Sequence, residues 1–166
     1  MKILLETGMK DCSATQVPMD PSTKLSKAPK EKGANERDYR RNIGCLRYLI
    51  NTWPDLSFCV GVLSRYMQAP KQSHEAALKQ VLRYLQGTLT YGLEFKRTHG
   101  MKIEGYSDSS LSVDEDDGRS TTGHVYYFAN SPITWCSQKQ ETVALSSCEA
   151  EFMAAIEAAK QAIRLQ

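Results

Sequence analysis

The sequence has no apolar run that approaches the roughly 20 residues needed for a membrane-spanning helix. Near its start only Ile3 to Leu5 form an apolar stretch before Glu6. That stretch is shorter than the roughly 7 to 15 apolar residues of a secretory signal. These absences predict a chain without a signal peptide, a membrane segment or a membrane partner, and they favour the cytoplasm or the nucleus.

Paired cysteines are also missing. The five cysteines are an odd number, are widely spaced and include no CxxC pair, and none of the three histidines lies near them in the sequence. This pattern excludes a regular disulfide framework and a local Cys/His zinc motif. It is typical of reduced thiols in an intracellular protein.

Charge is present but unevenly distributed. Residues 1–100 carry 16 Lys and Arg against 9 Asp and Glu, whereas residues 101–166 carry 5 against 10. A basic part suggests a polyanionic partner, and an acidic part is where a cation site would be sought. From charge alone, two differently charged solvated surfaces are an equally good interpretation.

The first 88 residues divide into a strap and a helical region. Residues 1–36 are predicted to be a linker or strap with a short N-terminal helix that Gly8 ends, because residues 10–36 lack periodicity and contain three prolines and five lysines. Residues 37–88 show the apolar spacing of three helices, interrupted at Pro54, before Pro70 and at Gly87. We therefore expect a small helical bundle over residues 37–88.

The pattern changes after Thr88. The segments "TYGLEF" (90–95), "MKIEGYS" (101–107), "GHVYYFA" (123–129) and "ITWCSQ" (133–138) are typical of strands, and a helix follows from Ser146. An apolar stripe on that helix is predicted from Phe152, Ile156, Ala159 and Ile163. The fold class expected is α+β, with a helical bundle followed by a β-β-β-α unit over residues 89–166.

Five carboxylates fall between Asp108 and Asp117. The run Asp114 to Asp117 does not fit an EF-hand, because Val113 and His124 stand where acidic ligands are needed. We interpret that run as a solvated loop. Asp108 differs, since it lies near the end of a predicted strand, where the backbone can direct its carboxylate.

The final helix offers one further carboxylate. Glu149 and Glu151 lie roughly 200° apart around the axis, so only one of them can address a given ion. Glu149 has capping-box spacing from Ser146, whereas Glu151 has no such role. The candidate metal pair is therefore Asp108 with Glu151, although the helix dipole alone also favours a glutamate there.

Several motifs together resemble a known family. The segments "YRRNIGCLRYLINTWPDLSFCVGVLSRYMQAPKQSHEAALKQVLRYLQGT" and "GYSDSS…DGRSTTGHVYYFANSPITWCSQKQETVALSSCEAEFMAAIEAAK" are similar to the Pol polyprotein of copia-type retrotransposons, from the end of the reverse transcriptase into ribonuclease H. The resemblance covers nearly the whole chain. It implies that the helical region is a thumb or connection that contacts template and primer. It also implies that the acidic part is the opening β-β-β-α unit of a ribonuclease H fold.

The resemblance also implies roles for particular residues. In that family the carboxylates matching Asp108 and Glu151 hold two Mg²⁺ or Mn²⁺ ions that cleave RNA in RNA/DNA hybrids. The partner implied is such a hybrid or another nucleic acid, and the basic candidates to contact it are Arg40, Arg41, Arg47, Arg65, Lys79, Arg83 and Lys139. Lys139 fits a solvated turn equally well. The paired aspartates of the polymerase palm are absent, which excludes DNA synthesis.

The family's next catalytic aspartate follows a further strand, whereas this sequence ends at Gln166. We therefore expect an incomplete two-ion site, no activity of the chain alone, and self-association through an exposed edge of the 101–107 strand. The alternatives are a non-enzymatic nucleic-acid-binding protein, a host-recruited interaction protein, and an enzyme completed by a second chain.

Overall fold

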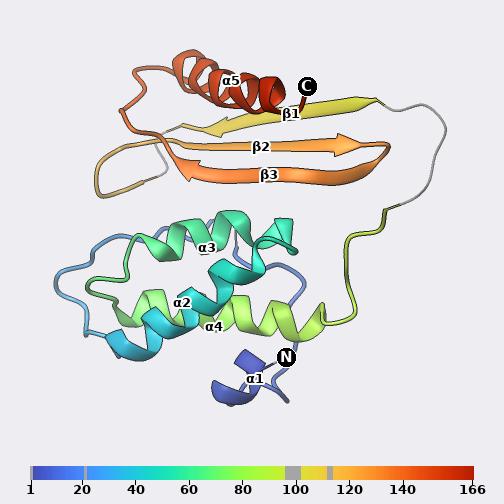
Figure 1. Cartoon of the computed structure of the whole chain (residues 1–166). Coiled ribbons are helices and arrows are strands. Elements are labelled where there is room, and N and C mark those ends of the chain that lie inside the picture. Colours follow the sequence, from blue (N-terminus) through green and yellow to red (C-terminus); the bar gives the residue numbers. More distant parts are fainter. Residues whose placement is uncertain (1, 21, 96–101, 112–113) are drawn as a thin grey trace. The chain divides into compact units, whose positions relative to one another are not determined.

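The chain forms two compact units, Met1–Gly92 and Leu93–Gln166 (Figure 1). The computed structural model describes residues 2–20, 22–95, 102–111 and 114–166. Helices make up the regular structure of the first unit, and a sheet with one helix makes up that of the second. This is the α+β composition that the sequence predicts.

Five helical segments build the first unit. They are α1 (Lys2–Glu6), α2 (Glu36–Leu49), the 3₁₀ turn η1 (Pro54–Leu56), α3 (Ser57–Ser64) and α4 (Gln72–Gly87). The side chain of Asn35 caps α2 by accepting the N–H of Asp38 at 3.2 Å. The helices expected on either side of Pro54 and up to Gly87 are therefore confirmed.

The core of the first unit joins the bundle to the strap. Helix α2 contributes Tyr39, Ile43 and Leu46, and α3 and α4 contribute further buried aliphatic side chains. The strap contributes Leu4, which is 1% exposed, and Met19, together with other apolar residues. Ile3, Leu4, Met19 and Leu25 thus anchor the strap in this unit's hydrophobic core.

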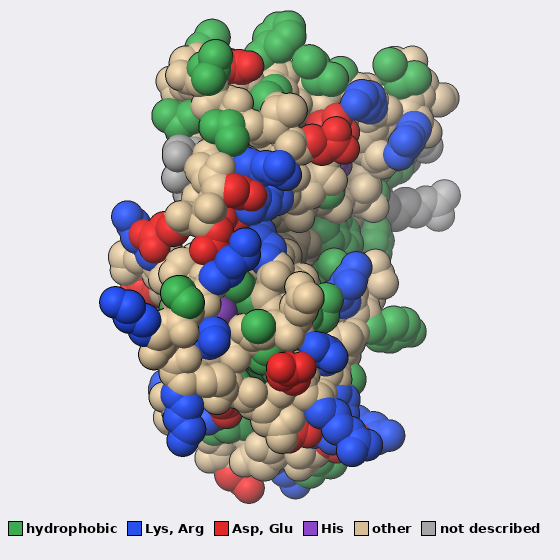
Figure 2. All heavy atoms as spheres, turned by 90° about the vertical axis from the view of Figure 1, so that its left-hand side faces the viewer, with side chains coloured by type: hydrophobic (Ala, Val, Ile, Leu, Met, Phe, Trp, Pro, Cys, Tyr) green, Lys and Arg blue, Asp and Glu red, His purple; other side chains and the backbone are tan. Residues whose placement is uncertain are grey.

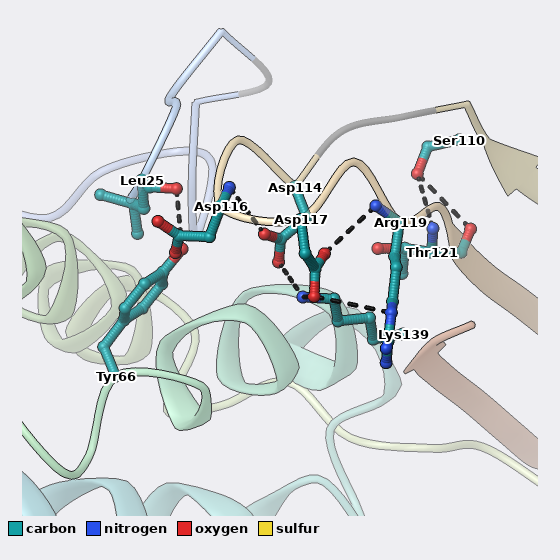
Figure 3. A network of polar contacts seen from close by, with 9 residues as sticks. All are labelled: Leu25, Tyr66, Ser110, Asp114, Asp116, Asp117, Arg119, Thr121 and Lys139. Carbon is teal, nitrogen blue, oxygen red and sulfur yellow. Dashed lines mark hydrogen bonds and ion pairs between the residues drawn. The ribbon is translucent and has the colours of Figure 1, made fainter. Parts of the chain in front are cut away.

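His74 fastens the strap to the bundle. Its fully buried ring stacks on Tyr66 with the ring centroids 4.0 Å apart. Its Nδ1 accepts the N–H of Lys71 at 2.9 Å, so Nε2 carries the proton and donates to the carbonyl of Ser26 at 2.9 Å. The Tyr66 hydroxyl donates to the carbonyl of Leu25 at 2.7 Å (Figure 3). One histidine therefore caps α4 and positions the strap.

The second unit is an antiparallel sheet with a helix on one face (Figure 1). Its elements are β1 (Ile103–Ser110), β2 (Thr121–Phe128), β3 (Ser131–Lys139) and α5 (Ser147–Arg164). The strand order is β1-β2-β3, and β2 and β3 are joined through Ala129 and Asn130, both with positive φ. Of the helices that the structure describes, none is long and apolar enough to cross a membrane.

One expected strand is absent. The prediction of a strand over residues 90–95 is wrong, because residues 91–95 have no regular structure. The carbonyl of Glu94 accepts the Ser131 hydroxyl at 2.8 Å instead. Alternating apolar residues do not form a strand unless a neighbouring strand is present to make hydrogen bonds with them. The strand expected over 101–107 is present from Ile103, and Met101 lies outside the described residues.

Helix α5 packs on a different face from the one predicted. Its buried residues are Ala150, Ala154 and Ala158, whereas Phe152 is 68% exposed and Ile163 is 71% exposed. The predicted Phe152, Ile156, Ala159 and Ile163 stripe therefore faces away from the sheet. The physical reason is distance, because small side chains at every fourth position let the helix lie close to the strands.

Tyr126 and Gly105 determine how closely α5 approaches β1. Tyr126 is 6% exposed, and its hydroxyl donates to the carbonyl of Ala158 at 2.6 Å. Its ring lies over Gly105, the residue paired with it on β1. A Cβ at Gly105 would lie 2.3 Å from a ring carbon of Tyr126. Glycine is therefore required at this position of β1.

Candidate functional site

Asp108 lies on β1, where it pairs with Gly123 of β2, and it is exposed. Side chains alternate between the two faces of a strand. Because Gly105 faces Tyr126 beneath α5, the odd-numbered positions of β1 face α5 and Asp108 lies on the opposite face. The carboxylate of Asp108 is thus held on a regular strand that solvent can reach.

Glu151 reaches the same strand from α5. Its Oε1 accepts the backbone N–H of Ser109 at 3.3 Å. The helix carboxylate is therefore hydrogen-bonded to the residue that directly follows Asp108. Since Glu151 comes from the helix-covered face, the two carboxylates can meet only at the outer edge of β1.

Glu149 has a different role from its neighbour. Ser146 accepts the N–H of Glu149 at 3.2 Å, as expected of an N-cap. In a standard capping box the carboxylate of Glu149 would accept the N–H of the N-cap residue, Ser146. Here it accepts the N–H of the preceding residue, Leu145, at 2.7 Å. The cap occupies Glu149 and leaves Glu151 as the helix residue directed toward β1.

Asp108 and Glu151 provide the hard oxygen donors that Mg²⁺ prefers. This ion is commonly held by one or two carboxylates while it keeps several waters. The residue types of this candidate pair are therefore ones that such an ion takes. Within the described ranges, no group of three or more His, Cys, Asp or Glu side chains gathers to form a larger metal site.

The acidic run differs from the predicted solvated loop at its first residue. The side chain of Asp114 is 2% exposed, and its Oδ2 lies 2.6 Å from the ammonium of Lys139. Asp117 lies 2.7 Å from the same ammonium (Figure 3). The solvated-loop interpretation is therefore wrong for Asp114, because β3 presents a lysine that neutralises it.

The Lys139 ammonium and the two aspartates that it contacts, Asp114 and Asp117, are called the Lys139 clamp here. This clamp influences the pKa of Asp117. Partial burial opposes ionisation, but the Lys139 ammonium and the N–H of Arg119 together hold the pKa of Asp117 below its usual value. A carboxyl whose pKa is lowered by folding stabilises the folded state at neutral pH and loses that effect as the pH falls through its folded pKa. The clamp is thus strongest where both aspartates are ionised.

His124 and Cys136 pair across β2 and β3 beneath α5. Burial lowers the pKa of His124, although the Glu157 carboxylate acts in the opposite direction. Burial also raises the pKa of Cys136, and Glu157 adds to that shift. Both groups are held in their neutral forms, which does not favour a thiolate nucleophile or a charged site here.

The predicted basic candidates mostly contact their own unit. Arg40 donates to the carbonyl of Met67 at 2.7 Å and pairs with Glu36, and Arg83 donates to the carbonyl of Ser13 at 2.8 Å. Pairs with nearby acids also engage Arg41 and Lys79. On the face drawn in Figure 2, basic side chains over the helical unit are interspersed with acidic and apolar ones.

The remaining candidates are Arg47, Arg65 and Lys139. Arg47 is exposed, and its side chain makes no hydrogen bond or ion pair with another described residue. Arg65 closes the C-terminal end of α3. Lys139 belongs to the second unit, where its ammonium lies between Asp114 and Asp117. Contacts within the helical unit thus hold Arg40, Arg41, Lys79 and Arg83.

Sequence reasoning missed Gln140. Its side chain is buried, and its Nε2 donates to the Thr122 hydroxyl and to the carbonyl of Ala150, each at 3.0 Å. It thereby fixes the start of α5 against β2, directly before Glu151. No pattern in the sequence distinguishes this glutamine from the other polar residues that end β3.

The comparisons with known proteins identify relatives. The chain is 40% identical over 152 residues to the retrovirus-related Pol polyprotein from transposon RE1 of Arabidopsis thaliana, covering 92% of the chain and 10% of the relative. It is 36% identical over 172 residues to the Pol polyprotein from transposon TNT 1-94 of Nicotiana tabacum, covering 99% of the chain and 13% of the relative. The chain thus spans about a tenth of these polyproteins.

A third relative is similar in extent to the chain. Secreted RxLR effector protein 161 of Plasmopara viticola is 47% identical over 128 residues, which cover 76% of the chain and 90% of that protein. No family model and no solved structure matches the chain.

Proposed function

We propose that this chain, which is 36 to 40% identical to segments of retrovirus-related Pol polyproteins from transposons, derives from such a polyprotein and corresponds to the junction of reverse transcriptase and ribonuclease H. In this proposal the second unit descends from a nuclease that cleaves RNA in RNA/DNA hybrids. Asp108 and Glu151 are the two residues of the chain that hold a divalent cation, Mg²⁺ or Mn²⁺.

The contact between Glu151 and Ser109 carries the proposal. Glu151, which lies 42 positions after Ser109, reaches the edge of β1 because α5 lies close over that strand. The N–H of Ser109 orients Glu151 at a distance of 3.3 Å. Asp108 is exposed beside it, so that a phosphodiester can approach.

Asp108 and Glu151 have different roles in this proposal. Bound in such a site, a divalent cation activates water and stabilises the leaving oxygen of a phosphodiester. Asp108 supplies a carboxylate that the strand holds in place. Glu151 supplies the second and is kept in position by the Ser109 N–H, by the Ser146 cap and by the Gln140 contact to Ala150.

We expect the chain alone to bind a hybrid without cleaving it. Among the residues that the structure describes, no group of three or more His, Cys, Asp or Glu side chains gathers, whereas a two-ion centre needs further carboxylates. Binding to phosphates through basic side chains such as Arg47 is electrostatic and should weaken steeply as salt rises.

The test combines both measurements on one sample. A labelled RNA/DNA hybrid is incubated with the full chain in Mg²⁺ or Mn²⁺, while fluorescence anisotropy reports binding and a gel reports cleavage. We expect salt-dependent binding, no cleavage, and equal hybrid affinity for Asp108→Asn. Cleavage that Asp108→Asn abolishes would contradict the expected inactivity, and absence of binding would contradict the nucleic-acid partner.

A second candidate function is a non-enzymatic interaction protein. It is favoured by effector protein 161, because the chain matches 90% of that relative while spanning about a tenth of the polyproteins. A stand-alone protein of this size can use its surface without a metal. The two functions differ in metal binding: hybrid binding by a wild-type chain that binds no Mn²⁺, with the same hybrid affinity in the Asp108→Asn, Glu151→Gln double variant, would support this second function.

A further inference from the structure

The outer edge of β1 is open. Within the part of the chain that the structure describes, β1 is an edge strand and pairs only with β2. The N–H of Ser109 points away from β2 to Glu151, whereas the carbonyl of Lys102 accepts the N–H of Ala129, next to β2. Backbone groups alternate along a strand. Ile103, Gly105 and Ser107 therefore direct their N–H and C=O groups to the open edge.

The opposite edge strand, β3, has two features that hinder pairing with a further strand, and β1 has neither of them. Strand β3 contains Pro132, and its pairing with β2 is interrupted by a bulge at Tyr126 and Tyr127. Proline and bulges are devices that prevent pairing at an exposed edge. Strand β1 is eight residues long, contains no proline and keeps one uninterrupted register with β2. Between Ile103 and Ser107 this edge therefore has neither a proline nor a bulge.

We propose that β1 pairs antiparallel with β1 of a second copy of this chain, with Gly105 opposite Gly105 of the partner. In this register Ile103 of one protomer lies opposite Ser107 of the other. All three of these positions direct backbone groups outward, so they exchange hydrogen bonds across the dimer axis. A shift by one residue would place outward groups opposite inward ones.

Shifts by two residues also keep the outward-directed backbone groups opposite one another, and among these registers charge favours the one proposed. On the face away from α5, pairing through Gly105 places Lys102 of each protomer opposite Asp108 of its partner. Sliding the partner strand by two residues in one direction places Glu104 opposite Asp108 of the partner. Sliding it in the other direction places Glu104 opposite Glu104 of the partner. Opposite charges across a strand pair stabilise it and like charges destabilise it. Two symmetric Lys102–Asp108 pairs thus favour the proposed register.

The side chains on that face are compatible with a second copy. The ammonium of Lys102 is exposed and lies 2.8 Å from Glu104, so it can rotate toward a partner without leaving a buried charge behind. Tyr106 is 60% exposed and packs edge-on to Tyr127 with centroids 6.0 Å apart. An added strand would cover this ring. The inference does not depend on the proposed nuclease ancestry.

The experiment is a charge swap on the full chain, followed by sedimentation over a concentration series with EDTA present. We expect dimers of the wild-type chain. Lys102→Glu and Asp108→Lys should each raise the dimer dissociation constant about tenfold, because two attractive pairs become repulsive. The double variant Lys102→Glu, Asp108→Lys should return to within about threefold of wild type, since both pairs are restored.

A matched control is Lys160→Glu, which changes the same charge on α5 beside Glu157. It should leave the dissociation constant unchanged. Circular dichroism establishes that each variant is folded. A chain that stays monomeric at all concentrations would overturn the proposal. The proposal would also be overturned if neither single charge reversal changed the dimer dissociation constant. It would equally be overturned if the double variant dimerised as weakly as the single variants.

Discussion

Replacing Lys139 with methionine is expected to destabilise the sheet unit by about 3 kcal/mol. The substitution keeps the length of the side chain but removes the ammonium that lies 2.6 Å from Asp114 and 2.7 Å from Asp117. Because the Asp114 side chain is 2% exposed, its charge would remain buried with less compensation. Hydrogen exchange of β2 and β3 amides measures the loss within this unit.

Two variants control that result. Lys160→Met removes an exposed ion pair with Glu157 and should change stability by less than about 0.5 kcal/mol. Adding Asp114→Asn to Lys139→Met should recover part of the loss, because no buried charge remains. If Lys139→Met is as mild as Lys160→Met, the clamp does not stabilise the fold.

Gly105→Ala is expected to cost about 2 kcal/mol in the same unit. The added Cβ would lie 2.3 Å from the ring of Tyr126. The ring is buried and its hydroxyl is bonded to the carbonyl of Ala158, so it cannot yield freely. Faster exchange in β1 and α5 would report the displaced contact.

The chain contains a matched glycine for this test. Gly123 also lies within the sheet, but a Cβ there would be 3.8 Å from its nearest neighbour, an ordinary contact. Gly123→Ala should therefore change stability by less than about 0.5 kcal/mol. Equal effects of the two substitutions would show that the Tyr126 contact does not determine the requirement for glycine.

The helical unit could be predicted well because its boundaries are local. Pro54 and Gly87 mark where helices begin or end, and the apolar spacing identifies Tyr39, Ile43 and Leu46 as buried. The ordered packing of the strap was not predicted. It depends on His74 and Tyr66, which are distant in sequence from the residues that they hold.

The sheet unit shows where local patterns are insufficient. The helical period correctly identifies α5, but larger apolar residues drew the prediction to Phe152 and Ile163. The contact with β2 requires small side chains, which hydrophobicity does not reveal. Burial of Asp114 was equally invisible, since its partner Lys139 lies 25 residues later on β3.

For the candidate site, the sequence alone names both carboxylates, Asp108 and Glu151. The structure adds the Glu151 contact to Ser109 and the support from Gln140. Arginines such as Arg40 and Arg83 are occupied by backbone carbonyls of their own unit, which composition cannot indicate.

The most direct test of the central claim is a titration of the full chain with Mn²⁺, followed through the electron paramagnetic resonance signal of the free ion. The account predicts binding that weakens about tenfold or more in Asp108→Asn and in Glu151→Gln. Glu149→Gln serves as the control, because Glu149 caps α5 two residues away and should not affect the ion. Equal Mn²⁺ affinity in all four proteins would contradict a metal site at the edge of β1.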